Sequence, residues 1–335
     1  MFAEMERAGR VYFGPLIASA IALYAVCRGG WALFVGHAAL EPALTLDLSR
    51  HPRVASLVGE VATKLRTRPA DHILLGMSGS FHVFQGKALL LTGQQIEGRI
   101  LHLSAPLSRI LTREELGAVL AHEFAHFTGG DALYSCHVAP VYRSAQEGLR
   151  VLWQAFGAPV RSLYSLLFRV VYIPPLVLAY AFLIGFRLID KRLSRARELR
   201  ADKVASTVYG REVFASALMR VVGYGTVLDC TADHDFATLL KDGKTFLNYP
   251  AAFSEARAEY EGPAEQIVLE ALAEPTRTFD THPSLHSRLG SLEVSPETVA
   301  LSVSRETGGP WGDELSLEEQ DLSDRYARLV EMALG

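Results

Sequence analysis

The feature that most constrains the fold is a short segment, His122-Glu123-Phe124-Ala125-His126. It lies within residues 111–127, whose apolar residues recur with the period of an α-helix. Thr112 and Glu115 have the spacing of a capping box, which predicts that this helix begins beside them. Residues four apart in a helix lie one turn apart on one face. Any fold of this chain must therefore leave room for two imidazoles side by side.

Two neutral imidazoles at this spacing suit a tetrahedral zinc ion, which binds histidine nitrogen at about 2.0–2.1 Å. Glu123 follows the first histidine and is placed to act on a water bound to that metal. Zinc lowers the pKa of such a water to about 7, and Glu123 would take its proton as general base. A catalytic zinc ion usually has three protein ligands, so the two histidines leave the site one ligand short.

Glu198 is the candidate for the third ligand. It lies in a predicted helix, Ser194–Asp202, and shares a face of that helix with Asp202, four residues further on. One carboxylate of this pair would bind the metal while the other accepts a hydrogen bond from the outer ring N–H of a histidine ligand. Asp131 and Glu147 are the competing acids. Asp131 lies beyond the end of the first helix, where it is more simply a loop residue or a contact of the ligands.

A polar cluster, Asp280-Thr281-His282-Pro283, is followed by His286 and Arg288. A residue before proline is held in an extended or turn conformation, which suits His282 for projecting into a cleft. Its imidazole would there donate a hydrogen bond to the oxyanion of a tetrahedral intermediate. A histidine before proline is also common in ordinary loops, so the pattern alone leaves both interpretations open.

In the order and spacing of these motifs, the chain resembles the membrane zinc metallopeptidases that include HtpX and the CAAX prenyl endopeptidases. The resemblance covers residues 110–290. It implies His122, His126 and Glu198 as zinc ligands and Glu123 as general base. It further implies Asp202, Asp131 and Arg288 as contacts of the ligands and His282 as a stabiliser of the transition state. The implied fold is mainly α with a small β-sheet (α+β), a zincin-like core with membrane-embedded helices.

Short apolar runs separated by glycines predict the small sheet (His72–Leu75, Phe81–Phe84, Ala88–Thr92 and Arg99–Ser104). The resemblance places this sheet above the active-site helix, with Arg99–Ser104 as the edge strand that pairs with an extended peptide substrate. Residues 43–70 precede the sheet and have the apolar period of a helix.

Composition argues against a nucleic-acid partner and indicates a reducing compartment. The formal net charge of −4 and a pI near 6.3 give no basic excess for neutralising phosphates, so we expect no nucleic-acid partner. The three cysteines, Cys27, Cys136 and Cys230, are scattered, which argues against a disulfide framework and fits a reducing compartment. We interpret them as small apolar residues.

The mean hydropathy of +0.16 is high, and the apolar excess is concentrated in two stretches. Residues 1–40 hold the charge-free run Val11–Cys27, the break Arg28-Gly29-Gly30 and a second apolar run, which predict an anchor or a hairpin in the membrane. Val170–Phe186 is the second stretch, and Pro174-Pro175 would kink it. The expected parts are 1–40 (anchor), 41–145 (sheet and motif helix), 146–190 (embedded hairpin) and 191–335 (third ligand and His-Pro loop).

The shared metal restricts how the chain meets a membrane. His126 and Glu198 must lie on one side of it, so the chain between them crosses an even number of times. We favour an embedded or tightly packed hairpin at 146–190, because Arg150 and Arg161 are costly at the bilayer centre. A second span around Leu149–Phe168, or a buried hairpin in a soluble enzyme, stays open. The basic residues after Phe186 place the site on the cytoplasmic side of a bacterial-type cell membrane.

These patterns predict a zinc endopeptidase that holds one zinc ion per chain and cleaves membrane-associated or unfolded proteins. Its partners would be a peptide or protein substrate and membrane lipid. Two alternatives stay open: a non-catalytic membrane chaperone or adaptor with a retained zinc site, and a metal-dependent hydrolase of small amides.

Overall fold

The computed structural model describes residues 38–128, 142, 145–150, 153–154, 163–276, 282–297 and 309–334. The chain divides into two compact units. We call Ala38–Ala132 with Lys191–Gly335 the sheet unit, and Met1–His37 with Leu133–Asp190 the helical unit. The predicted class is confirmed, since helices dominate the described residues and a single five-stranded sheet accompanies them.

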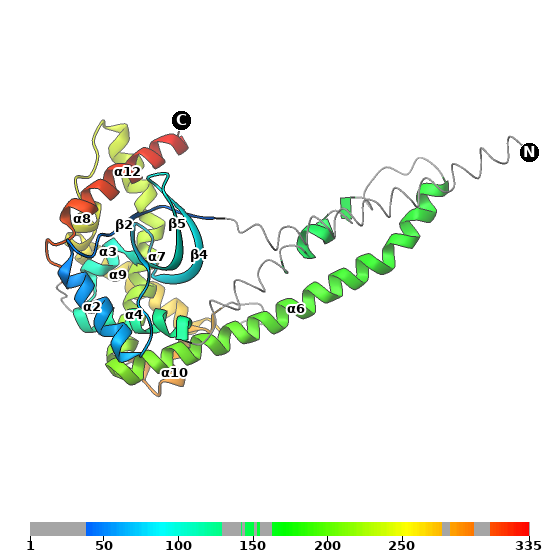
Figure 1. The fold of residues 1–335 in the computed structure, drawn as a ribbon, viewed down its shortest axis with the longest axis horizontal. Coiled ribbons are helices and arrows are strands. Elements are labelled where there is room, and N and C mark those ends of the chain that lie inside the picture. The colour runs from blue at the N-terminus through cyan, green and yellow to red at the C-terminus, as the bar shows by residue number, and fades with distance from the viewer. Residues whose placement is uncertain are drawn as a thin grey trace, which may run out of the picture. The chain divides into compact units, whose positions relative to one another are not determined.

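The sheet unit contains five strands in the order β1-β4-β5-β3-β2, of which Figure 1 labels β2, β4 and β5. Their bounds are Ala39–Glu41 (β1), Ala43–Thr45 (β2), His72–Gly76 (β3), His82–Leu90 (β4) and Gln95–Ser104 (β5). β4 and β5 form an antiparallel hairpin in which His82 pairs with His102. β3 runs parallel to β5, and β2 runs antiparallel to β3.

The two edges of this sheet are brought together by one segment of chain. β1 and β2 are separated only by Pro42, yet β1 pairs with β4 and β2 pairs with β3. The sheet therefore curls until its first and last strands are consecutive. One face of the sheet carries an apolar cluster of its own, apart from the main core (Ala43, Leu74, Ala88, Leu90, Ile96 and Ile100).

Three sequence expectations about this region are wrong. Residues 43–45 form β2, so the predicted helix over 43–70 is shorter, and α2 covers only Pro52–Lys64. The runs Phe81–Phe84 and Ala88–Thr92 fall largely within one strand, β4, because the residues between them continue its pairing with β5. Arg99–Ser104 belongs to β5, which lies between β4 and β3 and is not an edge strand.

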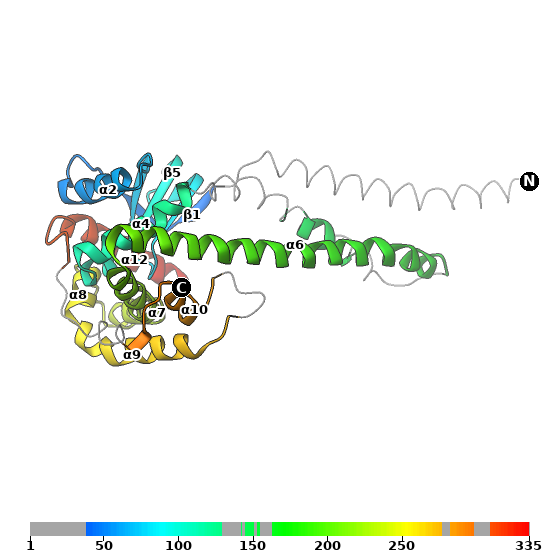
Figure 2. The same ribbon diagram turned by 90° about the horizontal axis from the view of Figure 1, so that it is seen from below.

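Helix α4, Arg113–Thr128, contacts the sheet through β4 and packs on α7, Arg211–Lys241 (Figure 2). The predicted capping box is present, since Thr112 N–H donates to Glu115 at 2.9 Å and Glu115 N–H donates to Thr112 Oγ1 at 3.2 Å. The other described helices of this unit are α3 (Ala105–Ile110), α8 (Tyr249–Glu255), α9 (Arg257–Ala273), α10 (Leu285–Ser291) and α12 (Ser316–Leu334).

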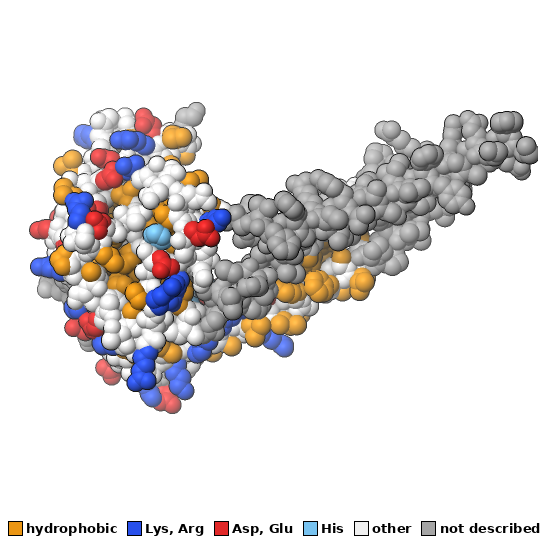
Figure 3. Space-filling model, in the orientation of Figure 1, with side chains coloured by type: hydrophobic (Ala, Val, Ile, Leu, Met, Phe, Trp, Pro, Cys, Tyr) orange, Lys and Arg blue, Asp and Glu red, His pale blue; other side chains and the backbone are white. Residues whose placement is uncertain are grey.

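Helix α6, Leu163–Tyr209, runs without a break from the predicted apolar stretch to the predicted third ligand. Helical structure continues through Pro174 and Pro175. In its described apolar part, several large side chains are exposed (Ile173, Val177, Leu178, Tyr180, Phe182 and Ile189), and Figure 3 shows apolar side chains gathered there.

Among the described residues, α7 alone satisfies the length and hydropathy expected of a membrane span. However, 67% of its most apolar window is buried inside the protein, which is typical of a core helix. The N-terminal apolar run Val11–Cys27 lies outside the described residues.

Candidate metal centre

Two helices bring the predicted ligands together. His122 and His126 come from α4, and Glu198 comes from the C-terminal half of α6. The two Nε2 atoms lie 3.4 Å apart. His122 Nε2 is 3.6 Å from Glu198 Oε2, and His126 Nε2 is 3.5 Å from Glu198 Oε1.

These separations test whether the residues fit a metal. Four ligands placed tetrahedrally about 2.05 Å from zinc are separated by about 3.3 Å. The three measured separations, 3.4, 3.5 and 3.6 Å, are close to that value. Two imidazole nitrogens and a carboxylate form a donor set that zinc accepts. The group therefore fits a zinc ion without any rearrangement of α4 against α6.

Asp202 contacts the ring nitrogen of His122 that faces away from Glu198, and Arg288 in turn contacts Asp202. Asp202 is fully buried, and its Oδ1 lies 2.9 Å from His122 Nδ1. Arg288 of α10 donates two hydrogen bonds to Asp202, at 2.8 and 2.6 Å. Burial raises the pKa of Asp202, but the hydrogen bonds from Arg288 and His122 outweigh that effect and lower it. The carboxylate is therefore ionised and holds the outer nitrogen of His122.

The charge on His122 follows from the same contacts. Burial lowers its pKa, but hydrogen bonds to Asp202 and Glu198 outweigh that effect and raise the pKa to about 9. The ring of Phe214 from α7 stacks on His122 with centroids 5.7 Å apart. One face of the imidazole is thus packed and its outer edge is held by Asp202, which leaves Nε2 directed toward Glu198.

Glu123 lies between the two histidines in sequence and is partly buried. Burial raises the pKa of its carboxyl group, against the nearby charges of His122 and His126. A carboxylate whose pKa is moved toward neutrality is a better proton acceptor at physiological pH than a solvated one.

His282 also lies at the site, because its Nδ1 is 3.2 Å from Glu198 Oε2. Its side chain is 65% exposed and so accessible from solvent. Asp131 and Thr281 lie outside the described residues. Glu147, the other competitor for the third ligand, is exposed and forms an ion pair with Arg150.

No pattern in the sequence indicates a second group of side chains that could hold a metal ion, Glu41, His82 and His102. They come from β1, β4 and β5. Glu41 and His102 are 61 residues apart, so no local spacing indicates that they meet.

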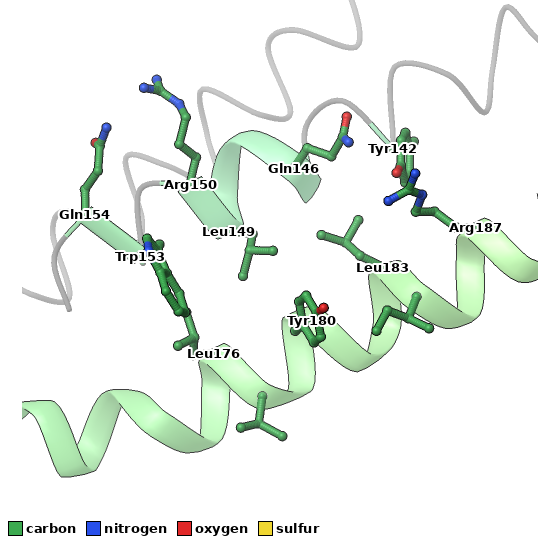
Figure 4. A pocket seen from close by; sticks show the side chains of 12 residues that line it. Tyr142, Gln146, Leu149, Arg150, Trp153, Gln154, Leu176, Tyr180, Leu183 and Arg187 are labelled. Carbon is green, nitrogen blue, oxygen red and sulfur yellow. The ribbon is translucent and has the colours of Figure 1, made fainter. Parts of the chain in front are cut away.

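The helical unit contains a pocket of about 870 Å³ that none of the predicted site residues lines. Six residues lie along one side (Tyr142, Gln146, Leu149, Arg150, Trp153 and Gln154), and residues between Leu176 and Arg187 of α6 lie along the other (Figure 4). Tyr180, Leu149 and Trp153 make its lining largely apolar, with Arg150 and Arg187 among the polar groups.

Comparison with known proteins gives a family match. The model of peptidase family M48 matches residues 89–295, more than half of the chain. Protease HtpX of Acinetobacter baylyi is 26% identical over 226 residues, which are 64% of this chain and 64% of the relative. A protease HtpX homolog of Pyrococcus furiosus is 29% identical over 140 residues, which are 39% of this chain and 45% of the relative. The chain thus spans less than two thirds of the length of these relatives.

Among solved structures, the crystal structure of S. mikatae Ste24p aligns with a TM-score of 0.37 and 15% identity. The alignment covers 75% of this chain and 52% of that chain.

Proposed function

This chain belongs to peptidase family M48, and on that premise we propose that it is a zinc-dependent endopeptidase with Glu123 as its general base. The observation that carries the proposal is the convergence of His122, His126 and Glu198, whose donor atoms are 3.4–3.6 Å apart beside Glu123. A zinc ion held there would polarise the scissile carbonyl and lower the pKa of a coordinated water to about 7.

The contacts of the surrounding residues support the roles that we propose for them. Glu123 accepts the proton of the attacking water and passes it to the leaving amine. Asp202 holds the outer nitrogen of His122 and so fixes which nitrogen faces the metal. Arg288 compensates the charge of the buried Asp202. His282, exposed at the edge of the site, donates a hydrogen bond to the oxyanion of the intermediate.

The substrate would bind as an extended strand on β4. β1 runs parallel to β4 and, among the described residues, pairs only with Ala88–Leu90. The stretch His82–Phe84 of β4 therefore lies before the N-terminal end of β1. β4 also contacts α4, the helix that carries Glu123. A peptide that pairs with a sheet edge is bound through its main-chain hydrogen bonds and not through particular side chains. This mode of binding suits unfolded or membrane-associated proteins as substrates.

The exposed apolar side chains of α6 support attachment to a membrane. Val177, Leu178 and Phe182 are 58, 72 and 55% exposed, which is costly in water and favourable against lipid. The basic residues that follow, from Arg187 to Arg200, favour a cytoplasmic position for that end. Extraction of the full chain from membranes by buffer without detergent, as a soluble monodisperse protein, would refute this part of the proposal.

The catalytic proposal is tested with Glu123→Gln, which keeps the shape of the side chain but removes its basicity. We expect the variant to retain zinc and to lose about 10²–10⁴-fold in the rate of cleavage of an unfolded reporter protein. Glu114→Gln, an exposed change in the first turn of the same helix, should cleave normally. Undiminished cleavage by Glu123→Gln would exclude the mechanism.

Two outcomes with the wild-type chain would favour the alternatives. Stoichiometric zinc without turnover of any protein or peptide would indicate a chaperone or adaptor. Turnover confined to small amides would indicate a different hydrolase.

A further inference from the structure

Three strands contribute a second set of side chains that could hold a metal ion. Glu41 lies on β1, and His82 and His102 lie directly opposite each other on β4 and β5. None of the three belongs to the His122–Glu198 site. Glu41 and His82 precede residue 89, where the match to the family model begins.

The separations of their donor atoms resemble those of the first site. Glu41 Oε2 lies 3.2 Å from His102 Nδ1 and 3.5 Å from His82 Nε2. All three donor atoms lie within 4.8 Å of one another. Ligands of a tetrahedral zinc ion are separated by about 3.3 Å, and the separation between Glu41 and His102 matches this value before His82 moves.

The surrounding residues fix His102 with Nδ1 directed toward Glu41. Its side chain is only 2% exposed, and its other nitrogen, Nε2, lies 3.1 Å from Ser78 Oγ. Gly76 leaves the space that this ring fills, because a Cβ at that position would overlap the imidazole of His102. A buried histidine whose outer nitrogen is hydrogen-bonded, with the inner one facing a carboxylate, has the arrangement found around metal-binding histidines.

We propose that Glu41, His82 and His102 bind a second divalent transition-metal ion of the Zn²⁺ type. Two imidazole nitrogens and one carboxylate oxygen suit zinc and leave a fourth position for water. The rings of His82 and His102 are stacked with centroids 4.5 Å apart and an interplanar angle of 15°. A metal lies in the plane of each imidazole that binds it, so His82 turns on binding. It is able to turn because its side chain is 39% exposed.

The ion would have a structural effect on the sheet. β1 is only three residues long and pairs with three residues of β4. An ion shared by Glu41, His82 and His102 ties β1 to both strands of the β4–β5 hairpin, and so holds the sheet closed. Because the ion would bind the folded chain and not the unfolded chain, it would stabilise the fold by mass action.

The experiment measures zinc per chain after the full-length protein is stripped with chelator, incubated with Zn²⁺ and desalted. We expect about two ions per wild-type chain, and about one in each of Glu41→Gln, His82→Gln and His126→Gln. The double variant His82→Gln with His126→Gln should hold none. His72→Gln on the neighbouring strand β3, outside both clusters, is the matched control and should hold two.

A second measurement guards against variants that fold poorly. In the His126→Gln background, which removes the first site, added Zn²⁺ should raise the unfolding temperature, and Glu41→Gln should abolish that increase. One zinc ion per wild-type chain, with none in His126→Gln, would overturn the second site and leave the proposed endopeptidase function intact. Unchanged zinc in Glu41→Gln and His82→Gln would overturn it as well.

Discussion

Replacing Asp202 with asparagine removes the charge of a fully buried side chain while almost preserving its shape. Asp202 accepts hydrogen bonds from Arg288 at 2.8 and 2.6 Å, and the guanidinium is itself only 13% exposed. Removing one partner of a buried ion pair leaves the other charge uncompensated and costs about 3–5 kcal/mol. We expect the metal-free chain to lose that much of its free energy of unfolding.

The same change should weaken zinc binding, because Asp202 Oδ1 lies 2.9 Å from the outer nitrogen of His122. Loss of such an orienting carboxylate lowers metal affinity about 10–100-fold. Stability would be measured by denaturant unfolding of the zinc-free chain, followed through the buried Trp311. Zinc affinity would be measured by competition with a chromophoric chelator.

Asp321→Asn is the matched control. Asp321 also forms an ion pair, with Arg325 at 2.9 Å, but the two side chains are 50 and 34% exposed. An exposed pair contributes about 0–1 kcal/mol, so this variant should unfold nearly as the wild type does. If both variants cost less than about 1 kcal/mol, the argument from burial is wrong.

A double variant separates the two roles of Asp202. Asp202→Asn combined with Arg288→Met removes the uncompensated charge and should recover most of the lost stability. Its zinc affinity should stay low, because nothing restores the hold on His122. Zinc affinity equal to that of the wild type in either variant would refute the orienting role.

Two further predictions concern protonation and close packing. Burial lowers the pKa of His122, but hydrogen bonds to Asp202 and Glu198 outweigh that effect and raise the pKa from 6.5 to about 9. Protonated His122 therefore stabilises the metal-free chain fully below pH 6.5, and this contribution is lost as pH rises through 9. Zinc uptake at neutral pH should accordingly release about one proton, measured from the dependence of the binding enthalpy on the buffer; zero protons would contradict this. Gly79→Ala should cost about 1–3 kcal/mol, because its Cβ would overlap the backbone of Gly225 on α7. Gly59→Ala, with nothing within 4 Å, should instead gain about 0.5–1 kcal/mol, and a loss in both variants would show that packing against α7 is not the cause.

Much of the candidate site was predictable, because each of its pairs of side chains lies four residues apart on one helix. His122 and His126 share a helix face by geometry alone, and Thr112 with Glu115 marks where that helix starts. Glu198 and Asp202 follow the same rule. Their meeting with α4 needed the tertiary structure or a family resemblance, since nothing in the sequence between them indicates it.

The sheet was less predictable. Alternation of apolar residues indicates which face of a strand is buried but not which strands lie beside it. Arg99–Ser104 therefore has the pattern of any half-buried strand, and only the register shows that β5 is central. The segment 43–45 has too few residues for its period to separate strand from helix.

The sequence by itself determined α4, its two histidines and the carboxylate pair on α6, because helix geometry is fixed by residues one turn apart. Only the tertiary structure decided that β1 and β2 close the sheet, and that Glu41 meets His82 and His102. Contacts between residues this far apart depend on strand order and register. Those are set by the packing of the whole sheet and not by any short stretch of chain.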